Sequence, residues 1–575
     1  MPPAAPINAA PIDGAQLAIL HNRLNGVTRK MSNTLFRTGR SGVLTRVRDF
    51  SCCIVTADCE LIAVAEALPI HVLAGADMMA RAMKQFHPKL KPGDAFLHNS
   101  PYHGCGHAAD HTILVPVFDG GGTHRFTVLA KAHQADIGNS IPTTYHGAAR
   151  DVFEEGALIF PAVQVARDYE VIDDIVRMCR MRIRVPEQWS GDFLAMMGAA
   201  RIGERELTAL AGEVGWEKLD RFCTTWLDYS EQRCAEAIRR LPAATTQAIS
   251  IHDTFPGLPA EGVAIKAIVT SDPVDGYVHV DLTDNPDCTP NGLNLSEASS
   301  LTAAYMGVFN SLDGGVPKNA GSMRRFRVTL RDNCICGIPR HPTSCSLGTS
   351  NISERVANAV AMAMATLGEG IGMAETGSGA PGCGVISGID PRTGAQHIDS
   401  VTLAFTGGAA SARADAWVTI GAIGGGGQAF LDSIELTELY QPIEIVERVL
   451  LADTEGAGRK RGAPSLRVEF GPVGGSFDFG FFSDGLTNGP KGVRGGGTGG
   501  TSAQVRRTVS GALEPIDACG QATLLPGETL IATSSGGGGY GNPRDRDRAA
   551  VREDLAEGWI TTERARTVYG LTDDA

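Results

Sequence analysis

Glycine is the feature that most constrains this chain, because it is both frequent and unevenly placed. The sequence has 70 glycines in 575 residues, against about 7% in an average protein. The runs GGGG at 424–427, GGGTGG at 495–500 and GGGGYG at 536–541 all lie in the last third of the chain. They lack the three-residue period of collagen, and apolar residues are interleaved with them, unlike in a flexible linker. We therefore expect tight turns within a folded region rich in strands.

The hydrophobic pattern of the remaining chain changes between helical and strand-like segments. Apolar residues three and four positions apart predict an amphipathic helix over 14–38, with Asp13 as its N-cap. Short β-branched or alternating runs follow, interrupted by a helical stretch near 74–86. Residues 170–240 have almost no glycine and a helical periodicity, and another helix is expected at about 352–366.

These segments predict a mixed α/β (α+β) fold class with several domains, since 575 residues exceed the usual size of one domain. We expect an α/β domain over 1–165 and a helical segment over 166–245. An α/β middle region is expected over 246–394, and a glycine-rich β region with C-terminal helices over 395–575. The sequence shows no internal repeat of about 20 to 50 residues, so it does not favour a solenoid or a propeller.

The charge and the cysteines limit the expected partners and location. The 64 acidic and 51 basic residues give a net charge of −13, which repels nucleic-acid phosphates and anionic lipid. We therefore expect no nucleic-acid or membrane partner.

The N-terminal segment lacks the basic and apolar regions of a signal peptide, and no stretch reaches the roughly 18 apolar residues that span a bilayer. The 13 cysteines include no C-x-x-C pair, so we expect reduced thiols in a cytoplasmic protein.

The densest group of possible metal ligands lies in HNSPYHGCGHAADH, residues 98–111. His107 and Asp110 are three residues apart beside a glycine-containing turn, so an imidazole nitrogen and a carboxylate oxygen can converge on one divalent ion. The same stretch contains three more histidines, His98, His103 and His111. The alternative interpretation is a group of surface-loop histidines without an ion.

Two further candidates stand where strands are expected to begin or end. His133 closes the apolar run RFTVLAKA, with Asp136 three residues later, and site residues often collect where strands give way to loops. Asp49 directly precedes another apolar run. For Asp49 alone, a turn residue or an ion pair with Arg46 or Arg48 is the simpler interpretation.

A series of motifs runs in order along nearly the whole chain. RVRDFSC at 46–52 precedes ADCELIAVAEALPIHV at 57–72, which is close to D-G-x-L-V-A-x-A-x-x-I-P-V-H. Residues 93–118 are close to GD-x-x-x-x-NDPY-x-GGTH-x-x-D-x-x-x-x-x-PVF. Later motifs are AHQADIGN at 132–139, VPKNAGSMRRFRV at 316–328, SIELTELYQPIEIVERVLLADTEGAGRKRG at 433–462 and SGGGGYGNPRDRD at 535–547. In this order the motifs resemble the hydantoinase B/oxoprolinase family.

The resemblance implies one half of a two-part enzyme. In this family, a hydantoinase A-type partner binds ATP and phosphorylates the substrate's oxygen, and the B-type chain carries a metal site. The family's ligands fall on Asp49, His107, Asp110 and His133 of this sequence. The resemblance therefore implies a divalent metal cofactor, Zn or Mn, and a hetero-oligomer with the A-type subunit. The chain has no P-loop motif, so ATP is expected on the partner.

Two departures from the family pattern lie in the candidate metal loop. NDPY reads NSPY, with Ser100 in place of the acid, and GGTH reads GCGH, with Cys105. We expect Cys105 to line the pocket. The residues expected to contact substrate are Asn99, Ser100, Tyr102 and Asp136.

The resemblance implies an ATP-dependent amidohydrolase acting on a small cyclic amide of the hydantoin, oxoproline or lactam type. Two alternatives stay open at the level of sequence. The chain could be a subunit of an ATP-dependent ketone carboxylase of the acetone or acetophenone type, or a non-catalytic scaffold with a structural metal. A structural site is closed by four protein ligands, whereas a catalytic site keeps one position open.

Overall fold

The computed structural model describes residues 12–65, 68–377, 379, 381–405, 407–418 and 430–572. Its N-terminal part contains a seven-stranded antiparallel sheet with the order β2-β1-β5-β4-β3-β6-β7. The strands are β1 (Phe50–Thr56), β2 (Leu61–Val64), β3 (Ala95–His98), β4 (Asp110–Phe118), β5 (His124–His133), β6 (Val163–Arg167) and β7 (Glu170–Val171). The strand β5 therefore has β1 on one side and β4 on the other.

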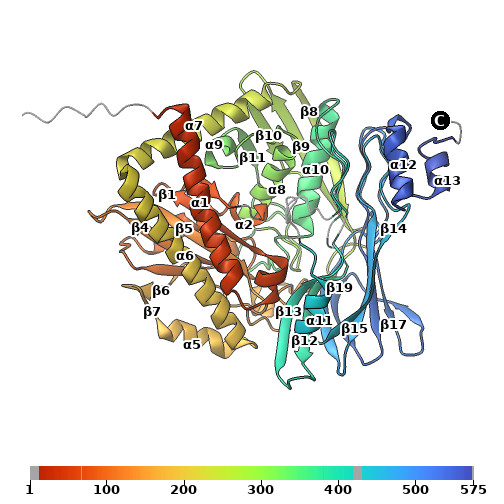
Figure 1. Ribbon diagram of the computed structural model, residues 1–575, viewed down its shortest axis with the longest axis horizontal. Helices are drawn as coiled ribbons and strands as arrows, with labels where there is room; N and C mark the ends of the chain where they lie inside the picture. The colour runs from red at the N-terminus through yellow and green to blue at the C-terminus, as the bar shows by residue number, and fades with distance from the viewer. Residues whose placement is uncertain are drawn as a thin grey trace, which may run out of the picture.

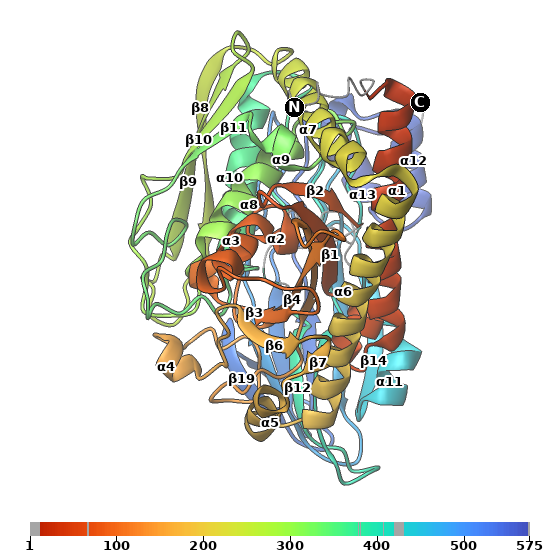
Figure 2. The same ribbon diagram turned by 90° about the vertical axis from the view of Figure 1, so that its left-hand side faces the viewer.

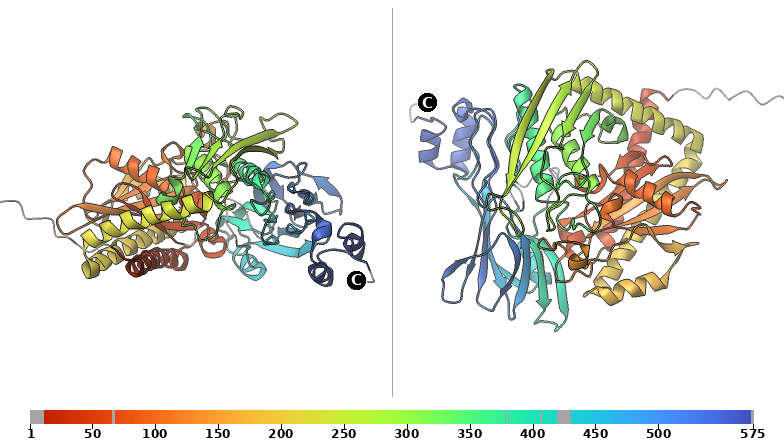
Figure 3. Two further views of the ribbon diagram at one scale, coloured as in Figure 1. Left: turned by 90° about the horizontal axis from the view of Figure 1, so that it is seen from above. Right: turned by 180° about the vertical axis from the view of Figure 1, so that it is seen from behind.

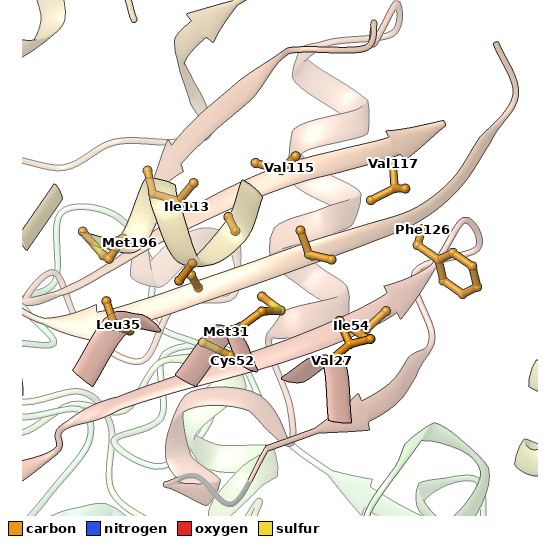
Figure 4. Packing of buried hydrophobic residues seen from close by; sticks show 14 of the residues in the cluster. Val27, Met31, Leu35, Cys52, Ile54, Ile113, Val115, Val117, Phe126 and Met196 are labelled. Atoms are coloured by element: carbon orange, nitrogen blue, oxygen red, sulfur yellow. The ribbon is translucent and has the colours of Figure 1, made fainter. Parts of the chain in front are cut away.

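Two long helices, α1 (Gly14–Thr38) and α6 (Pro186–Val214), cover one face of this sheet. The Asp13 side chain caps α1 as predicted. The two helices lie side by side (Figure 2) and approach closely, because a Cβ on Gly203 would lie 2.6 Å from Met31 Sδ. Figure 4 shows side chains of α1 and α6 packed against strand residues such as Ile54 and Val115.

The opposite face of the sheet is buried as well, which explains the continuous apolar runs in its strands. Successive side chains of a strand point to opposite faces. Cys52 and Ile54 therefore join the core beneath α1, whereas Cys53 and Val55 join a second core that includes α3 (Ala76–Phe86). A strand that is buried on both faces has apolar residues at consecutive positions, instead of alternating polar and apolar residues.

Residues 170–240 are largely helical, as predicted, in α5 (Asp173–Arg182), α6 and α7 (Trp216–Ile238). A short helix, α4 (Val152–Glu155), precedes them. Within the described part of the chain, no helix combines the length and apolar character needed to cross a bilayer. The division into four domains at the predicted boundaries stays a prediction.

A second sheet and two helices form the middle of the molecule (Figures 1 and 3). The strand order is β11-β10-β9-β8, and β10 and β11 run parallel. Helices α8 (Glu297–Phe309) and α10 (Ile352–Leu367) pack together, and nearly all of α10 is buried. The remaining elements are β8 (Ala244–His252), β9 (Val263–Asp272), β10 (Tyr277–Asp281), β11 (Phe326–Thr329) and α9 (Ala320–Met323).

The C-terminal part contains two sheets, with orders β13-β12-β16-β19 and β14-β15-β20-β17-β18. Residues of both sheets, such as Phe479 and Val468, share one hydrophobic core, so the sheets pack face to face. The first sheet has β12 (Cys383–Ile389), β13 (Gln396–Thr402), β16 (Phe477–Phe482) and β19 (Cys519–Leu524). The second has β14 (Ile443–Leu451), β15 (Ser465–Pro472), β17 (Ala503–Arg507), β18 (Leu513–Pro515) and β20 (Thr529–Thr533). The helices are α11 (Ile434–Tyr440), α12 (Arg548–Ala556) and α13 (Thr562–Thr567). The predicted mixed α/β fold class is confirmed.

The glycine runs GGGTGG and GGGGYG are only in small part the tight turns that we expected: Gly495, with φ 89°, lies in a turn closed by the bond from Gly496 N to Val493 O, over 3.0 Å. The two runs lie against each other as irregular backbone, and Gly539 N donates to Gly497 O over 3.0 Å. A Cβ on Gly496 would lie 2.1 Å from Gly539 O. Glycine is required here because backbones pack directly against each other and leave no room for a side chain. The run at 424–427 lies outside the described residues.

The packing of α1 can be tested by truncating one buried residue. Leu24 is 1% exposed in the core beneath α1, so Leu24→Ala should lower the free energy of unfolding by about 2–5 kcal/mol. Ile19, on the same helix, is 60% exposed, and Ile19→Ala should change it by less than about 0.5 kcal/mol. Denaturant unfolding followed by circular dichroism measures both, and equal effects of the two substitutions would contradict the assigned helix face.

Candidate metal centre

Three of the candidate ligands meet where strand β5 ends. His133 is the last residue of β5, and the antiparallel register places it opposite Asp110, the first residue of β4. On its other side, His133 N donates to Asp49 O over 3.0 Å, just before β1. Because β5 runs antiparallel to both neighbours, its end meets the beginnings of β1 and β4. Strand pairing therefore sets Asp49, His133 and Asp110 side by side.

His107 completes the group from the turn that precedes β4. Its Nε2 lies 2.8 Å from Asp110 Oδ1, and His133 Nδ1 lies 3.3 Å from the same oxygen. Asp49 Oδ2 lies 4.0 Å from His133 Nδ1. The donor atoms of His107, Asp110 and His133 lie within 4.8 Å of one another, and all three residues are buried. The structure thus brings together all four residues that the sequence indicated as candidate ligands.

The arrangement of the donor atoms fits a divalent ion. His107 Nδ1 lies 3.0 Å from Ser346 O, and His133 Nε2 lies 3.0 Å from Thr144 Oγ1, so each ring is held by the nitrogen that points away from the group. Histidines that bind metals are commonly oriented in this way. Asp110 Oδ1 faces both His107 Nε2 and His133 Nδ1, and is thus the oxygen placed to share an ion with them. The buried Asp110 Oδ2 makes no hydrogen bond among the described residues and lies 3.4 Å from His71 Nε2. Two imidazole nitrogens and two carboxylates suit zinc or manganese.

Neighbouring charges and hydrogen bonds set the ionisation of these groups. Burial alone would raise the pKa of Asp110, but the charge of His107 and His71 and hydrogen bonds from His107 and His133 hold it well below its usual range. Burial likewise opposes ionisation of Asp49, yet contacts with His71 and His133 lower its pKa. Burial would lower the pKa of His107, and the Asp110 carboxylate outweighs this effect and raises it. Both carboxylates are therefore anionic at neutral pH.

The backbone before β1 turns Asp49 into the group. A π-helical turn over Val43–Val47 is followed by Arg48 in the left-handed region, with φ 59°. Arg46 pairs with Asp399 over 3.1 Å, and the Arg48 guanidinium lies over the ring of Phe430. Both arginines thus have other partners, and the ion pair considered for Asp49 from the sequence is wrong.

Three residues near the ligands were missed by the sequence analysis. His71, from the short helix α2 (Pro69–Val72), places Nε2 3.2 Å from Asp49 Oδ1 and 3.4 Å from Asp110 Oδ2. Lys131 Nζ is 3.8 Å from Asp110 Oδ2, and the Tyr145 ring stacks on His133 with a centroid distance of 5.0 Å. The only sequence signal was the position of His71 in the motif ending in IHV.

The group lines a cavity of about 170 Å³, several times the space that one water molecule needs. Asp49, His71, Asp110 and His133 contribute polar atoms to it. The other walls come from distant segments of the chain: Leu68, Ile70, Tyr145, Thr349, Glu354, Phe405, Phe430 and Phe482. An apolar cavity with a few convergent polar groups is typical of a small-molecule site.

The four residues expected to contact substrate do not line this cavity. The Asn99 amide bonds to the backbone of Ala108, Leu158 and Phe160. The hydroxyl of Ser100 lies 2.9 Å from His103 Nδ1, and that of Tyr102 donates to Thr343 O. The Asp136 carboxylate accepts from Gly138 N and Arg184. Their substrate contact stays a prediction, and the structure assigns each of them a structural bond.

The other histidines of residues 98–111 are separate from the ligand group. His98 and His111 are fully buried, and burial lowers their pKa to about 3. They are therefore neutral core residues, not surface-loop histidines. Cys105 is also buried and does not line the cavity, and burial raises its pKa to about 11, so the thiol is not activated as a nucleophile.

Comparison with known proteins gives a match over most of the chain. The sequence model of the hydantoinase B/oxoprolinase family matches residues 13–543. The caprolactamase subunit beta of Pseudomonas jessenii is 27% identical over 574 residues, which cover 98% of this chain and 97% of that protein.

Two solved structures share the fold. The crystal structure of the ATP-dependent caprolactamase from Pseudomonas jessenii has a TM-score of 0.84 at 24% identity, covering 98% of this chain and 97% of that chain. A nucleotide-free acetone carboxylase structure has a TM-score of 0.83 at 16% identity, covering 97% of this chain and 79% of that chain.

The raised pKa of His107 predicts a pH dependence in the metal-free chain. A group whose pKa is raised by folding stabilises the folded state below its unfolded pKa, about 6.5 for histidine, and this contribution is lost as the pH rises through the folded value. The melting temperature of chelator-treated wild-type chain should therefore exceed that of His107→Gln most below about pH 6.5, and the difference should shrink above it. A difference that grows with rising pH would contradict the Asp110–His107 ion pair.

Proposed function

The chain belongs to the hydantoinase B/oxoprolinase family, and we propose that it is the metal-dependent subunit of a two-component ATP-dependent amidohydrolase. Its substrate is a cyclic amide of the hydantoin, oxoproline or lactam type. The relative from Pseudomonas jessenii is named a caprolactamase subunit, which supports the reaction class. The observation that carries the proposal is the set of Asp49, His107, Asp110 and His133 at a buried, mostly apolar cavity.

The four residues would hold a divalent ion, which supplies a Lewis acid for the amide oxygen and lowers the pKa of a water molecule. Asp49, Asp110 and His133 reach the cavity, so an ion held by them would be accessible to substrate. A structural ion would be enclosed by protein ligands instead. The cavity therefore favours a catalytic subunit over the scaffold alternative.

The walls of the cavity suit a small ring. Leu68, Ile70 and Phe482 offer apolar contact for methylene groups, and Thr349 and Glu354 offer polar groups. Burial of the ring in such a pocket excludes bulk water, which strengthens each polar contact to the reacting amide.

ATP is assigned to an A-type partner because the chain offers no phosphate loop of its own. A resonance-stabilised amide resists hydrolysis, and phosphorylation of its oxygen creates an imidate-like carbon with phosphate as leaving group. Water then adds to that carbon, and the ring C–N bond breaks as the proton of the added hydroxyl passes to nitrogen, which leaves an acyl phosphate. A second water hydrolyses the acyl phosphate to the carboxylate and inorganic phosphate. In the described glycine runs, backbone N–H groups such as those of Gly497, Gly537 and Gly539 already donate to carbonyl oxygens, so they are not available to bind phosphate. The word "subunit" in the relative's name supports a partner.

Loss of a ligand should remove the metal but leave the fold. His107→Ala and His133→Ala each delete one imidazole donor, and we expect metal affinity to fall by at least about 100-fold, since even outer partners of ligands contribute about 10- to 100-fold. Elemental analysis of purified chains measures occupancy. His124→Ala is the matched control, because His124 begins the same strand and bonds Thr127. Full occupancy in both ligand variants would place the metal elsewhere.

The division of labour between subunits can be tested by reconstitution. The isolated chain should hydrolyse no ATP, and addition of an A-type subunit should give ATP-dependent opening of a cyclic amide, measured as amino-acid product. Chelation should abolish product formation and added Zn²⁺ or Mn²⁺ should restore it. ATP turnover by the isolated chain would contradict the proposal, and bicarbonate incorporation into a ketone would favour the carboxylase alternative.

A further inference from the structure

His71 is a buried histidine that the four-ligand set leaves without a role. It is 2% exposed, belongs to the short helix α2 and lines the cavity. Its Nε2 faces two carboxylates, 3.2 Å from Asp49 Oδ1 and 3.4 Å from Asp110 Oδ2. His71 therefore contacts both Asp49, just before β1, and Asp110, at the start of β4.

Each of the two carboxylates has one oxygen near the ligand histidines and one oxygen near His71. Asp110 Oδ1 lies 2.8 Å from His107 Nε2 and 3.3 Å from His133 Nδ1, and Asp49 Oδ2 lies 4.0 Å from His133 Nδ1. These atoms form the ligand side of the group. The other two oxygens, Asp49 Oδ1 and Asp110 Oδ2, are the ones that His71 approaches. His71 therefore contacts the oxygens that the ligand side does not use.

The partners of the two rings indicate opposite tautomers for His71 and His107. His107 Nδ1 faces the carbonyl oxygen of Ser346 at 3.0 Å, which only accepts, so Nδ1 keeps its proton. Nε2 donates to Asp110 Oδ1 at 2.8 Å in the metal-free chain and would give up that proton to bind an ion. In His71 the relation is reversed, because Nε2 faces two carboxylate oxygens that only accept. Its proton therefore belongs on Nε2, and Nδ1 accepts from the Ser51 hydroxyl at 3.1 Å.

We propose that His71 is a positioning residue: its Nε2–H donates to Asp49 Oδ1 and attracts Asp110 Oδ2, 3.4 Å away, and so turns the other oxygen of each carboxylate toward the ion. The proposal rests on the metal centre proposed above and adds a residue that holds the ligands without binding the ion. Ser51 completes the chain of contacts, because it lies two residues from Asp49 on the same strand segment and is buried. Without His71, two anionic carboxylates would face each other with one hydrogen-bond donor fewer.

The experiment uses the full chain and Mn²⁺ as the probe. Mn²⁺ affinity is measured by calorimetry for wild type, His71→Leu, which removes the donor, and His71→Gln, which keeps an N–H donor near the position of Nε2. We expect His71→Leu to weaken binding by about 10- to 100-fold and His71→Gln to remain close to wild type. Ser51→Ala should weaken binding less than His71→Leu, because it removes only the group that fixes the tautomer.

Pulsed electron paramagnetic resonance of the Mn²⁺-loaded chain then counts the coordinated imidazole nitrogens. Two are expected in wild type and in both His71 variants, whereas His107→Gln should lose one. A third imidazole that disappears in His71→Gln would make His71 a ligand and overturn the proposal, as would unchanged Mn²⁺ affinity in His71→Leu. If His71→Leu does not fold, the number of coordinated imidazole nitrogens in wild type and in His71→Gln tests whether His71 is a ligand. Absence of Mn²⁺ binding by wild type would instead overturn the metal centre itself.

Discussion

The centre of this structure depends on one buried carboxylate. Asp110 is fully buried, and an isolated charge in a protein interior costs several kcal/mol. His107, His133, His71 and Lys131 surround it with nitrogens at 2.8 to 3.8 Å, which keeps it ionised. A buried anion with converging nitrogens is a natural place for a divalent cation, because the ion balances charge that the protein must otherwise neutralise with protons.

The sheet supplies the rigidity that such a site needs. The strand β5 is hydrogen-bonded to β1 and β4, and both faces of the sheet are covered by helices or loops. The far wall of the cavity is held by a buried ion-pair network, in which Arg355 of α10 bonds Asp484 over 2.8 Å and Glu375 over 2.7 Å. Glu354, next to Arg355, and Phe482, two residues before Asp484, line the cavity. This network therefore joins the middle and C-terminal parts of the chain at the site.

Local elements could be predicted from the sequence where one physical signal dominated. The helix at 14–38 was confirmed to the residue, because its apolar stripe and Asp13 cap agree. The position of His133 at the end of a strand was also predicted. The turns expected for the glycine runs were found only at Gly495, because a sequence shows that glycine is needed but not whether a turn or a neighbouring backbone requires it. The ion pair for Asp49 failed for a similar reason, since Arg46 finds its partner Asp399 some 350 residues away.

The residue types at the candidate metal centre, the family and the class of fold could be predicted from the sequence, because these follow from ordered motifs and local periodicity. The sequence also indicated His107, Asp110 and His133 as one ligand set, through the three-residue spacing of His107 and Asp110 and through the family resemblance. The tertiary structure was needed to show which oxygens of Asp49 and Asp110 face His107 and His133, and that His71 contacts the other two. It also shows that the predicted substrate residues do not line the cavity. It also decided the cavity, whose walls come from segments hundreds of residues apart. The physical reason is that strand register and long-range packing set the distances between donor atoms, and neither is written in local sequence.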